Sequence, residues 1–240
     1  MTSFLEQLYA GKRQFKGLDI AEIDCIGIEA YDLDLRDCTF RDVSFRSANL
    51  ENMQTQNCTF LNCNFSHTRL MESQFTDSSF YELSAECTFF EADCRLCEFD
   101  GCDIRLANFE RSRLFQSKFH KTNATGANFF RADFNNATKI TECNFRMVDF
   151  RDAKVAKCDL RKTIFEQADL READFSKCKL TECDFAGAIT THLTIKGADL
   201  RGANIASFDA RTLDFAKVII YEEQGKVLLE NLGIQLIKRD

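Results

Sequence analysis

Cysteine is the reactive residue type that stands out in this sequence, because twelve cysteines occur among 240 residues. Neighbouring thiols could form disulfides or bind a metal ion such as zinc. The spacings of Cys58 to Cys63 and of Cys97 to Cys102 instead follow a five-residue repeat, and few histidines are available to complete a metal site. The sequence therefore predicts inert buried thiols, with neither a metal nor a cofactor. Free thiols indicate a reducing compartment and hence the cytoplasm.

Acid–base or nucleophilic chemistry has little support in the sequence. There is no glycine-rich phosphate loop, and no histidine has a carboxylate at a spacing typical of catalysis. The three histidines, His67, His120 and His192, fall at expected solvent positions in different parts of the repeat. We do not expect an enzyme.

The dominant feature of the sequence is a large residue at every fifth position, called a centre below. The centres include Leu35, Phe40, Phe45, Leu50, Phe60, Phe65, Leu70, Phe75 and Phe80, and later Leu160, Phe165, Leu170, Phe175, Leu180 and Phe185. A small residue often lies two positions before the centre, as Ala168 does before Leu170, and Asp or Asn often precedes the centre directly. A period of five fits neither a helix nor a single strand, so the sequence predicts a solenoid.

The repeat order small, Asp/Asn, Leu/Phe, polar, polar resembles the pentapeptide-repeat family over roughly residues 15 to 220. The segments ADLRE at 168–172, ADFSK at 173–177 and ADLRG at 198–202 are close to the family consensus. The resemblance implies an all-β, right-handed quadrilateral β-helix in which four pentapeptides form one coil. About ten coils, stacked at roughly 4.8 Å, would make a rod about 48 Å long.

Both ends of the chain depart from the repeat and are expected to cap the solenoid. Residues 1–14 should hold a short helix with Ser3 and Glu6 as its capping box, and residues 221–240 a second helix and a tail. Between them, residues 15–220 form the repeat, with register breaks near 81–88 and 135–141. Phe80 to Phe89 is nine residues rather than ten, read as a one-residue deletion, and Phe134 to Phe145 is eleven, read as a one-residue addition.

The segment VIIYEEQGKVLLENLGIQLI is similar to the C-terminal helix and tail of the quinolone-resistance (Qnr-type) members of the family. SFYELSAECTF at 79–89 and CDIRLANF at 102–109 also resemble the Qnr-type sequence around its inter-domain break. The resemblance implies a homodimer formed through the C-terminal ends. The corresponding apolar residues are Leu228, Leu229, Leu232, Ile234 and Leu236. A simple lid over the last coil is the alternative role for this segment.

In Qnr-type proteins the rod mimics duplex DNA and binds DNA gyrase or topoisomerase IV, so the resemblance implies that function here. Asp149, Asp169 and Asp209 precede centres and are the expected acidic ladder facing the enzyme, on the reading that they fall twenty residues, or one coil, apart. Turn stabilisation by the consensus Asp is the alternative explanation. Arg151, Arg171 and Arg211 follow the same centres and would dilute the negative potential. Phe90, Phe115 and Phe130 also follow centres, where they are expected to be exposed and could mark a partner surface.

The net charge of −7 disfavours nonspecific binding to nucleic acid or to an anionic membrane. The amino terminus reads as neither a signal peptide nor a membrane span. Many Qnr-type proteins carry two projecting loops, whereas Tyr81–Glu86 reads here as at most a short corner, so the resemblance implies topoisomerase binding more directly than drug protection. The expected function is a non-enzymatic topoisomerase binder, and an interaction scaffold with an unknown protein partner is the alternative.

Overall fold

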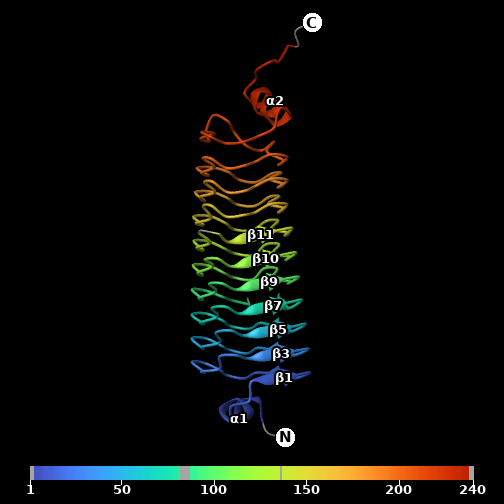
Figure 1. The fold of residues 1–240 in the computed structure, drawn as a ribbon, viewed down its shortest axis with the longest axis vertical. Coiled ribbons are helices and arrows are strands. Elements are labelled where there is room, and N and C mark those ends of the chain that lie inside the picture. Colours follow the sequence, from blue (N-terminus) through green and yellow to red (C-terminus); the bar gives the residue numbers. More distant parts are fainter. Residues whose placement is uncertain (1–2, 82–86, 136, 238–240) are drawn as a thin grey trace.

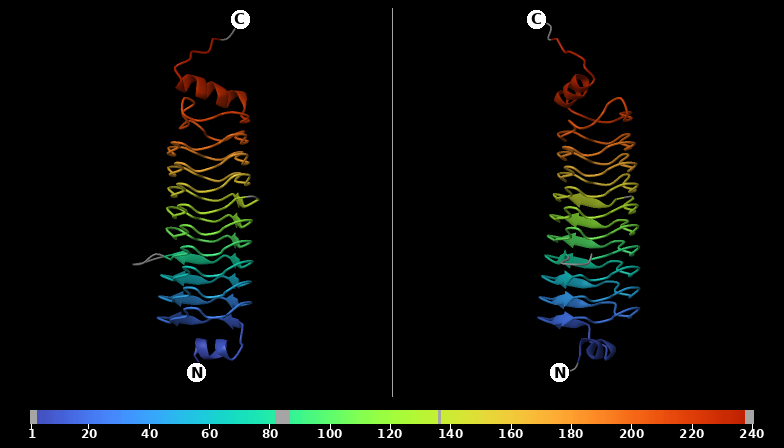
Figure 2. Two further views of the ribbon diagram at one scale, coloured as in Figure 1. Left: turned by 90° about the vertical axis from the view of Figure 1, so that its left-hand side faces the viewer. Right: turned by 180° about the vertical axis from the view of Figure 1, so that it is seen from behind.

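The computed structural model describes residues 3–81, 87–135 and 137–237, which form one straight rod of stacked coils (Figure 1). A short helix closes each end, and the two termini lie at opposite ends of the rod (Figures 1 and 2). The prediction of a pentapeptide-repeat β-helix with terminal cap helices is confirmed. No helix in the described ranges has the length and apolar character needed to cross a membrane.

Each coil is a square whose four sides are single pentapeptides, and each side stacks in parallel on the same side of the next coil. Side 1, called face 1, contains β1 (Gln14–Lys16), β3 (Asp34–Arg36), β5 (Gln54–Gln56), β7 (Gln74–Thr76), β9 (Glu98–Asp100), β10 (Lys118–His120) and β11 (Lys139–Thr141). Face 2 contains β2 (Asp19–Ala21), β4 (Thr39–Arg41), β6 (Thr59–Leu61) and β8 (Ser79–Tyr81).

The other two sides are held by isolated parallel bridges. On face 3 the bridged residues are Asp24, Ser44, Asn64, Thr88, Asn108, Asn128, Asp149, Asp169 and Ile189. On face 4 they are Glu29, Asn49, Arg69, Asp93, Arg113, Asp133, Lys154, Asp174 and Thr194.

Backbone hydrogen bonds join each coil to both neighbours. The N–H of Asn49 donates to the carbonyl of Ile28 in the preceding coil, and the next N–H, that of Leu50, donates to Arg69 in the following coil (both 2.8 Å). Because nearly every side needs both donors, a proline would break the ladder, and the chain contains none.

At most corners the chain turns at the residue two positions after the centre, where the backbone adopts a positive φ. Examples are Asp37 (51°), Asp42 (53°) and Ser47 (58°). This left-handed conformation costs about 1–2 kcal/mol for a residue with a Cβ, so the inter-coil hydrogen bonds must outweigh it at each corner.

The interior is filled by ladders of identical side chains. Phe60 lies between Phe40 and Phe80, with ring centroids 5.2 and 4.7 Å apart and the rings nearly parallel. Where a polar residue replaces a centre, as at Thr55, its hydroxyl lies 3.0 Å from that of Ser78. Within the described ranges, no buried side-chain nitrogen or oxygen lacks a hydrogen-bond partner.

All twelve cysteines are buried, as predicted. Most of the thiols donate to backbone carbonyls, as Cys58 does to Leu35 at 3.3 Å. Burial raises the pKa of Cys63 and of Cys102 to about 12, so both remain protonated at neutral pH. The thiols whose pKa is raised by burial therefore act as small apolar residues of the core, whereas the hydrogen bond with Cys58 lowers the pKa of Cys38.

The first register break was misread from the sequence. Gln74 pairs with Glu98, a separation of 24 residues where other coils have twenty, so this coil gains four residues and loses none. Phe80 and Phe89 stand on consecutive faces, which are normally five residues apart, and not on faces two apart. The expected corner at Tyr81–Glu86 falls largely on residues 82–86, outside the described ranges. The second break is confirmed, because Lys118 pairs with Lys139, 21 residues on.

The cap helices begin and end at the predicted signals. Helix α1 (Phe4–Tyr9) has the capping box, in which Ser3 N–H donates to Glu6 Oε2 (2.7 Å) and Glu6 N–H donates to Ser3 Oγ (3.2 Å). Phe4 and Leu8 of this helix are buried against the first coils. Helix α2 (Glu222–Asn231) covers the other end and is followed by Gly233 with φ +80°.

We expect Phe60→Ala to lower the free energy of unfolding by about 3–5 kcal/mol, because it opens a cavity in the phenylalanine ladder. Leu61→Ala is the matched control, since Leu61 is the adjacent residue of β6 and points outward. It should cost less than about 1 kcal/mol. Urea unfolding followed by circular dichroism measures both, and equal losses would contradict this account of the core.

Candidate functional site

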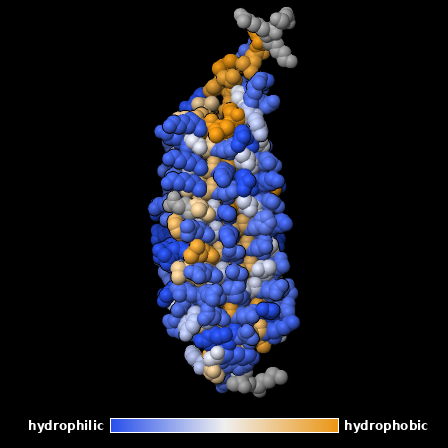
Figure 3. All heavy atoms as spheres, viewed as in Figure 1, coloured by the Kyte–Doolittle hydropathy of each residue, from blue (hydrophilic) through white to orange (hydrophobic). Residues whose placement is uncertain are grey.

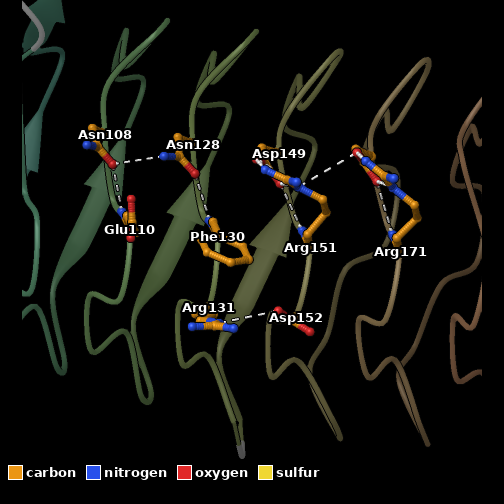
Figure 4. Close-up of polar contacts among 10 residues, drawn as sticks. Asn108, Glu110, Asn128, Phe130, Arg131, Asp149, Arg151, Asp152 and Arg171 are labelled. Carbon is orange, nitrogen blue, oxygen red and sulfur yellow. Dashed lines mark hydrogen bonds and ion pairs between the residues drawn. The ribbon is translucent and has the colours of Figure 1, made fainter.

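A polar strip runs along face 3, where Asn108, Asn128, Asp149 and Asp169 precede the centres of consecutive coils (Figure 4). The side-chain oxygen of each accepts the N–H two residues later: Glu110 to Asn108 and Phe130 to Asn128 at 2.9 Å, and Arg151 to Asp149 at 3.1 Å. The turn-stabilising role of these residues is therefore present in the structure.

Each aspartate of the strip also binds the arginine two residues later. Arg151 Nη2 lies 2.7 Å from Asp149 Oδ2, and Arg171 Nη2 lies 2.6 Å from Asp169 Oδ2. A longer contact of 3.8 Å joins Arg151 to Asp169 in the next coil. The hydrogen bond from Arg171 lowers the pKa of Asp169, so its carboxyl group stays ionised. From Asp149 to Arg171 the strip therefore alternates negative and positive groups.

The predicted acidic ladder is only partly formed. Asp149 and Asp169 lie in consecutive coils, but Ile189 occupies the next position on face 3, and its side chain is 48% exposed. Asp209 lies forty residues after Asp169, two coils on, and is paired with Arg211 at 2.9 Å. The prediction of a continuous ladder was wrong, because Asp169 and Asp209 are two coils apart and Ile189 lies between them.

The Asp–Arg pair recurs on other faces, so it does not by itself mark a site. The same two-residue spacing forms pairs at Asp34–Arg36, Asp93–Arg95, Asp103–Arg105, Asp159–Arg161 and Asp199–Arg201. Residues on either side of a centre both point outward, and an arginine side chain is long enough to reach its neighbour. Exposed pairs of this kind contribute little to stability.

What distinguishes face 3 is an aromatic residue between two guanidinium groups. The ring centroid of Phe130 lies 4.7 Å from the Arg131 guanidinium and 5.1 Å from that of Arg151. Arg131 also contacts Asp152 at 3.3 Å. An open groove of about 490 Å³ lies here, lined by Phe130, Arg131, Arg151, Asp152, Arg171 and Glu172.

The exposure predicted for the three aromatic residues holds best for Phe115, whose side chain is 36% exposed. Phe90 and Phe130 are half-buried. His67 packs edge-on against Phe90 at 5.7 Å, and the two arginines cover Phe130. The side chains that cover Phe90 and Phe130 come partly from adjacent coils. The sequence analysis did not assign residues to faces, so it could not identify these neighbours.

The second candidate surface is the C-terminal helix with its tail. Gln224 Nε2 donates to the carbonyls of Leu200 (2.8 Å) and Ala203 (2.7 Å), and this fixes α2 over the last coils. Leu228 is buried beneath the helix, so it belongs to the lid and not to an exposed dimer surface.

The other predicted interface residues face outward or lie at the edge of the helix. Leu229 is half-buried, and the exposed fractions of Leu232, Ile234 and Leu236 are 38%, 45% and 48%. Sequence reasoning missed Tyr221 and Ile237, which are 52% and 91% exposed. Tyr221 lines a hollow of about 410 Å³ with Ile220, Leu229 and Leu236. Apolar atoms are concentrated at this end of the rod (Figure 3).

No group of three or more His, Cys, Asp or Glu in the described ranges is arranged to hold a metal ion. His67 lies 3.4 Å from Glu91, and His120 Nδ1 lies 3.1 Å from Thr141 Oγ1 on another face. These two histidines are too far apart in the rod to act together.

The stacked coils, the five-residue side and the small and large core ladders define a pentapeptide-repeat β-helix. A family model of the pentapeptide repeat region matches residues 127–205, and a model of eight pentapeptide repeats matches residues 92–130 and 107–146. No curated protein sequence matches the chain.

The chain is a Qnr-like pentapeptide-repeat protein. A trypsin-treated variant of QnrB1, a plasmid-mediated fluoroquinolone resistance protein, is 25% identical with a TM-score of 0.74, covering 94% of this chain and 100% of that chain. A second trypsin-treated QnrB1 variant is 28% identical with a TM-score of 0.70, covering 79% of this chain and 90% of that chain.

We expect Arg171→Gln to raise the pKa of Asp169, because it removes the main hydrogen bond that favours the ionised carboxyl group. Since the folded-state pKa of Asp169 is lowered, its contribution to stability is present above the unfolded-state pKa and is lost as the pH falls. Carboxyl NMR titration measures the shift, and Arg161→Gln on face 1 is the control. An unchanged pKa in Arg171→Gln would contradict the assigned pairing.

Proposed function

We propose that this protein binds a type II topoisomerase, DNA gyrase or topoisomerase IV, through the side of its rod and changes the activity or the quinolone sensitivity of that enzyme. The observation that carries the proposal is the match to QnrB1 over 94% of this chain, since QnrB1 is a fluoroquinolone resistance protein. The protein acts in the cytoplasm, without catalysis, by occupying a surface that otherwise takes DNA.

The charge of the protein supports a basic partner. The chain carries a net charge of −7, and a dimer would carry about twice that value. An enzyme groove that attracts phosphates also attracts a straight rod with carboxylates at regular spacing. Binding would release counterions from the groove, as DNA binding does.

Face 3 is the proposed enzyme-facing surface, with Asp149 and Asp169 as its adjacent carboxylates and Asp209 further along. Their arginine partners are exposed side chains in weak ion pairs, so a basic groove can compete for the same carboxylates. The groove at Phe130 adds an aromatic surface between Arg131 and Arg151, a residue combination enriched at interaction hot spots.

A homodimer through the C-terminal helix and tail is the second part of the proposal. The exposed apolar residues Leu232, Ile234 and Leu236 would become buried at the contact. Joining two rods end to end would extend the surface that a DNA-binding groove encounters.

An interaction scaffold with a different protein partner remains the second candidate function. The observation that favours it is the pairing of every predicted ladder aspartate with an arginine, which leaves face 3 close to neutral. A neutral face has no preference for a groove built to bind phosphates.

The proposal predicts an effect on gyrase supercoiling when purified protein is added over a concentration series, with and without a quinolone. Inhibition alone, or recovery of activity in the presence of the drug, supports topoisomerase as the partner. An unchanged supercoiling rate at high micromolar protein, under both conditions, favours the scaffold.

Replacing Asp149 and Asp169 together by Asn tests face 3. Loss of both carboxylates should weaken gyrase binding by about tenfold, equivalent to about 1.4 kcal/mol. The control is Asp159→Asn with Asp199→Asn, which removes the same Asp–Arg pairs from the opposite face 1. Equal affinity for both double variants, measured by biolayer interferometry, would rule out face 3 as the contact.

Leu232→Asp combined with Leu236→Asp should convert the proposed dimer to a monomer, because two carboxylates would be buried without partners. Sedimentation velocity measures the change in mass. Leu228→Ala, which affects the lid contact only, should lower stability and leave the dimer intact. A dimer that persists in the double Asp variant would refute a contact through these residues.

A further inference from the structure

The strongest unexplained pattern on the rod is the charge order along face 4 and the corner that follows it. We call these residues together the face-4 surface. Its N-terminal part carries four exposed or half-exposed carboxylates and the guanidinium of Arg69, and the Arg13 guanidinium adjoins it at Tyr31 (5.7 Å). The carboxylates are those of Glu29, Asp32, Glu51 and Glu72. Arg69 is already paired with Glu51 at 2.7 Å.

The C-terminal part of the same surface has the opposite charge. Its exposed lysines are Lys154, Lys157, Lys177, Lys196 and Lys217. None of these ammonium groups forms an ion pair with any residue in the described ranges. Three carboxylates of the same face lie nearby, Asp133, Asp174 and Asp214, and they accept the backbone N–H groups of Asn135, Ser176 and Ala216. One surface therefore holds a block of net negative charge and a separate block of net positive charge.

The middle of the face-4 surface is apolar and internally neutralised. Leu96 and Phe115 are 40% and 36% exposed, in adjacent coils. Asp93 is paired there with both Arg95 (2.6 Å) and Arg113 (3.5 Å). The order along the rod is thus acidic, apolar and basic.

We propose that the face-4 surface binds a second copy of this chain, side by side and antiparallel, with the two-fold axis at Phe115. The bridged residues of face 4 allow the coils to be counted from one end of the rod to the other. Glu72 lies two coils before Phe115 and Lys157 two coils after it, and Asp32 and Lys196 lie four coils before and after. A two-fold axis therefore places each carboxylate opposite a lysine of the other copy.

A second copy fits this pattern better than a partner of uniform charge. Nucleic acid would be attracted by the basic block and repelled by the acidic block of the same straight surface. A parallel copy would place like charges together. An antiparallel copy satisfies both blocks and buries Phe115 and Leu96 at the centre, as an isologous contact requires.

This contact is independent of the proposed topoisomerase binding and of the C-terminal dimer. It uses face 4, whereas the proposed enzyme contact uses face 3 and the end-to-end contact uses α2 and the tail. A failure of the lateral contact would leave the other two proposals standing.

The first experiment is zero-length carbodiimide cross-linking of the full chain, using a mixture of ¹⁴N- and ¹⁵N-labelled protein and mass spectrometry. Glu72 and Lys157 are four coils apart in one chain, about 19 Å, too far for a direct amide bond. Mixed-isotope cross-links Glu72–Lys157 and Asp32–Lys196 are expected. Cross-links confined to the C-terminal tail, or the absence of mixed-isotope cross-links, would overturn the proposal.

The second experiment reverses the charges of each block separately. Asp32→Lys with Glu72→Lys makes the surface positive, and Lys157→Glu with Lys196→Glu makes it negative. Each double variant alone should lose at least about tenfold in lateral affinity, and an equimolar mixture of the two should regain it as a heterodimer.

Sedimentation velocity in low salt measures this association, with Leu232→Asp and Leu236→Asp present in every chain to remove end-to-end contacts. The control, Lys139→Glu with Lys179→Glu, alters two exposed lysines of face 1 and should have no effect. Circular dichroism verifies that each variant is folded. A mixture that fails to associate, or a control that behaves like the face-4 variants, would refute the antiparallel contact.

Discussion

The parallel stacking of coils in register is the interaction on which the rest of this structure depends. Each side donates one backbone N–H to the coil before it and one to the coil after it, as Asn49 and Leu50 do. This ladder places like residues above one another, so phenylalanine packs on phenylalanine inside and charged residues form rows outside. The positive φ at the corners is stable because the same hydrogen bonds fix both neighbouring sides.

The repeat made the fold predictable, because a large residue at every fifth position and a capping box at Ser3 are local signals. The coil register, by contrast, could not be predicted from local sequence signals, because it depends on which residues pair between coils. Counting from Phe80 to Phe89 could not tell whether these residues stand on consecutive faces, and pairing of Gln74 with Glu98 was needed to reveal four added residues. The place of Ile189 between Asp169 and Asp209, and the covering of Phe130 by two arginines, likewise depend on which residues stack.

The rows of stacked side chains on the outside of the rod differ in charge and polarity from one face to another. Face 3 has carboxylates held by arginines next to an aromatic groove, the face-4 surface has separated blocks of opposite charge, and the C-terminal end is apolar. A uniform core therefore supports surfaces that differ in the partners they can bind. The likeness to QnrB1 concerns the whole rod, whereas the charges on each face belong to this chain.

The central claim is that this rod occupies a DNA-binding surface of a type II topoisomerase. The most direct measurement is competition, in which fluorescently labelled duplex DNA bound to purified gyrase is titrated with the protein and anisotropy is recorded. The account predicts that the DNA is displaced and that a higher DNA concentration shifts the displacement curve in proportion. Unchanged anisotropy across the titration, with the protein folded, would contradict it.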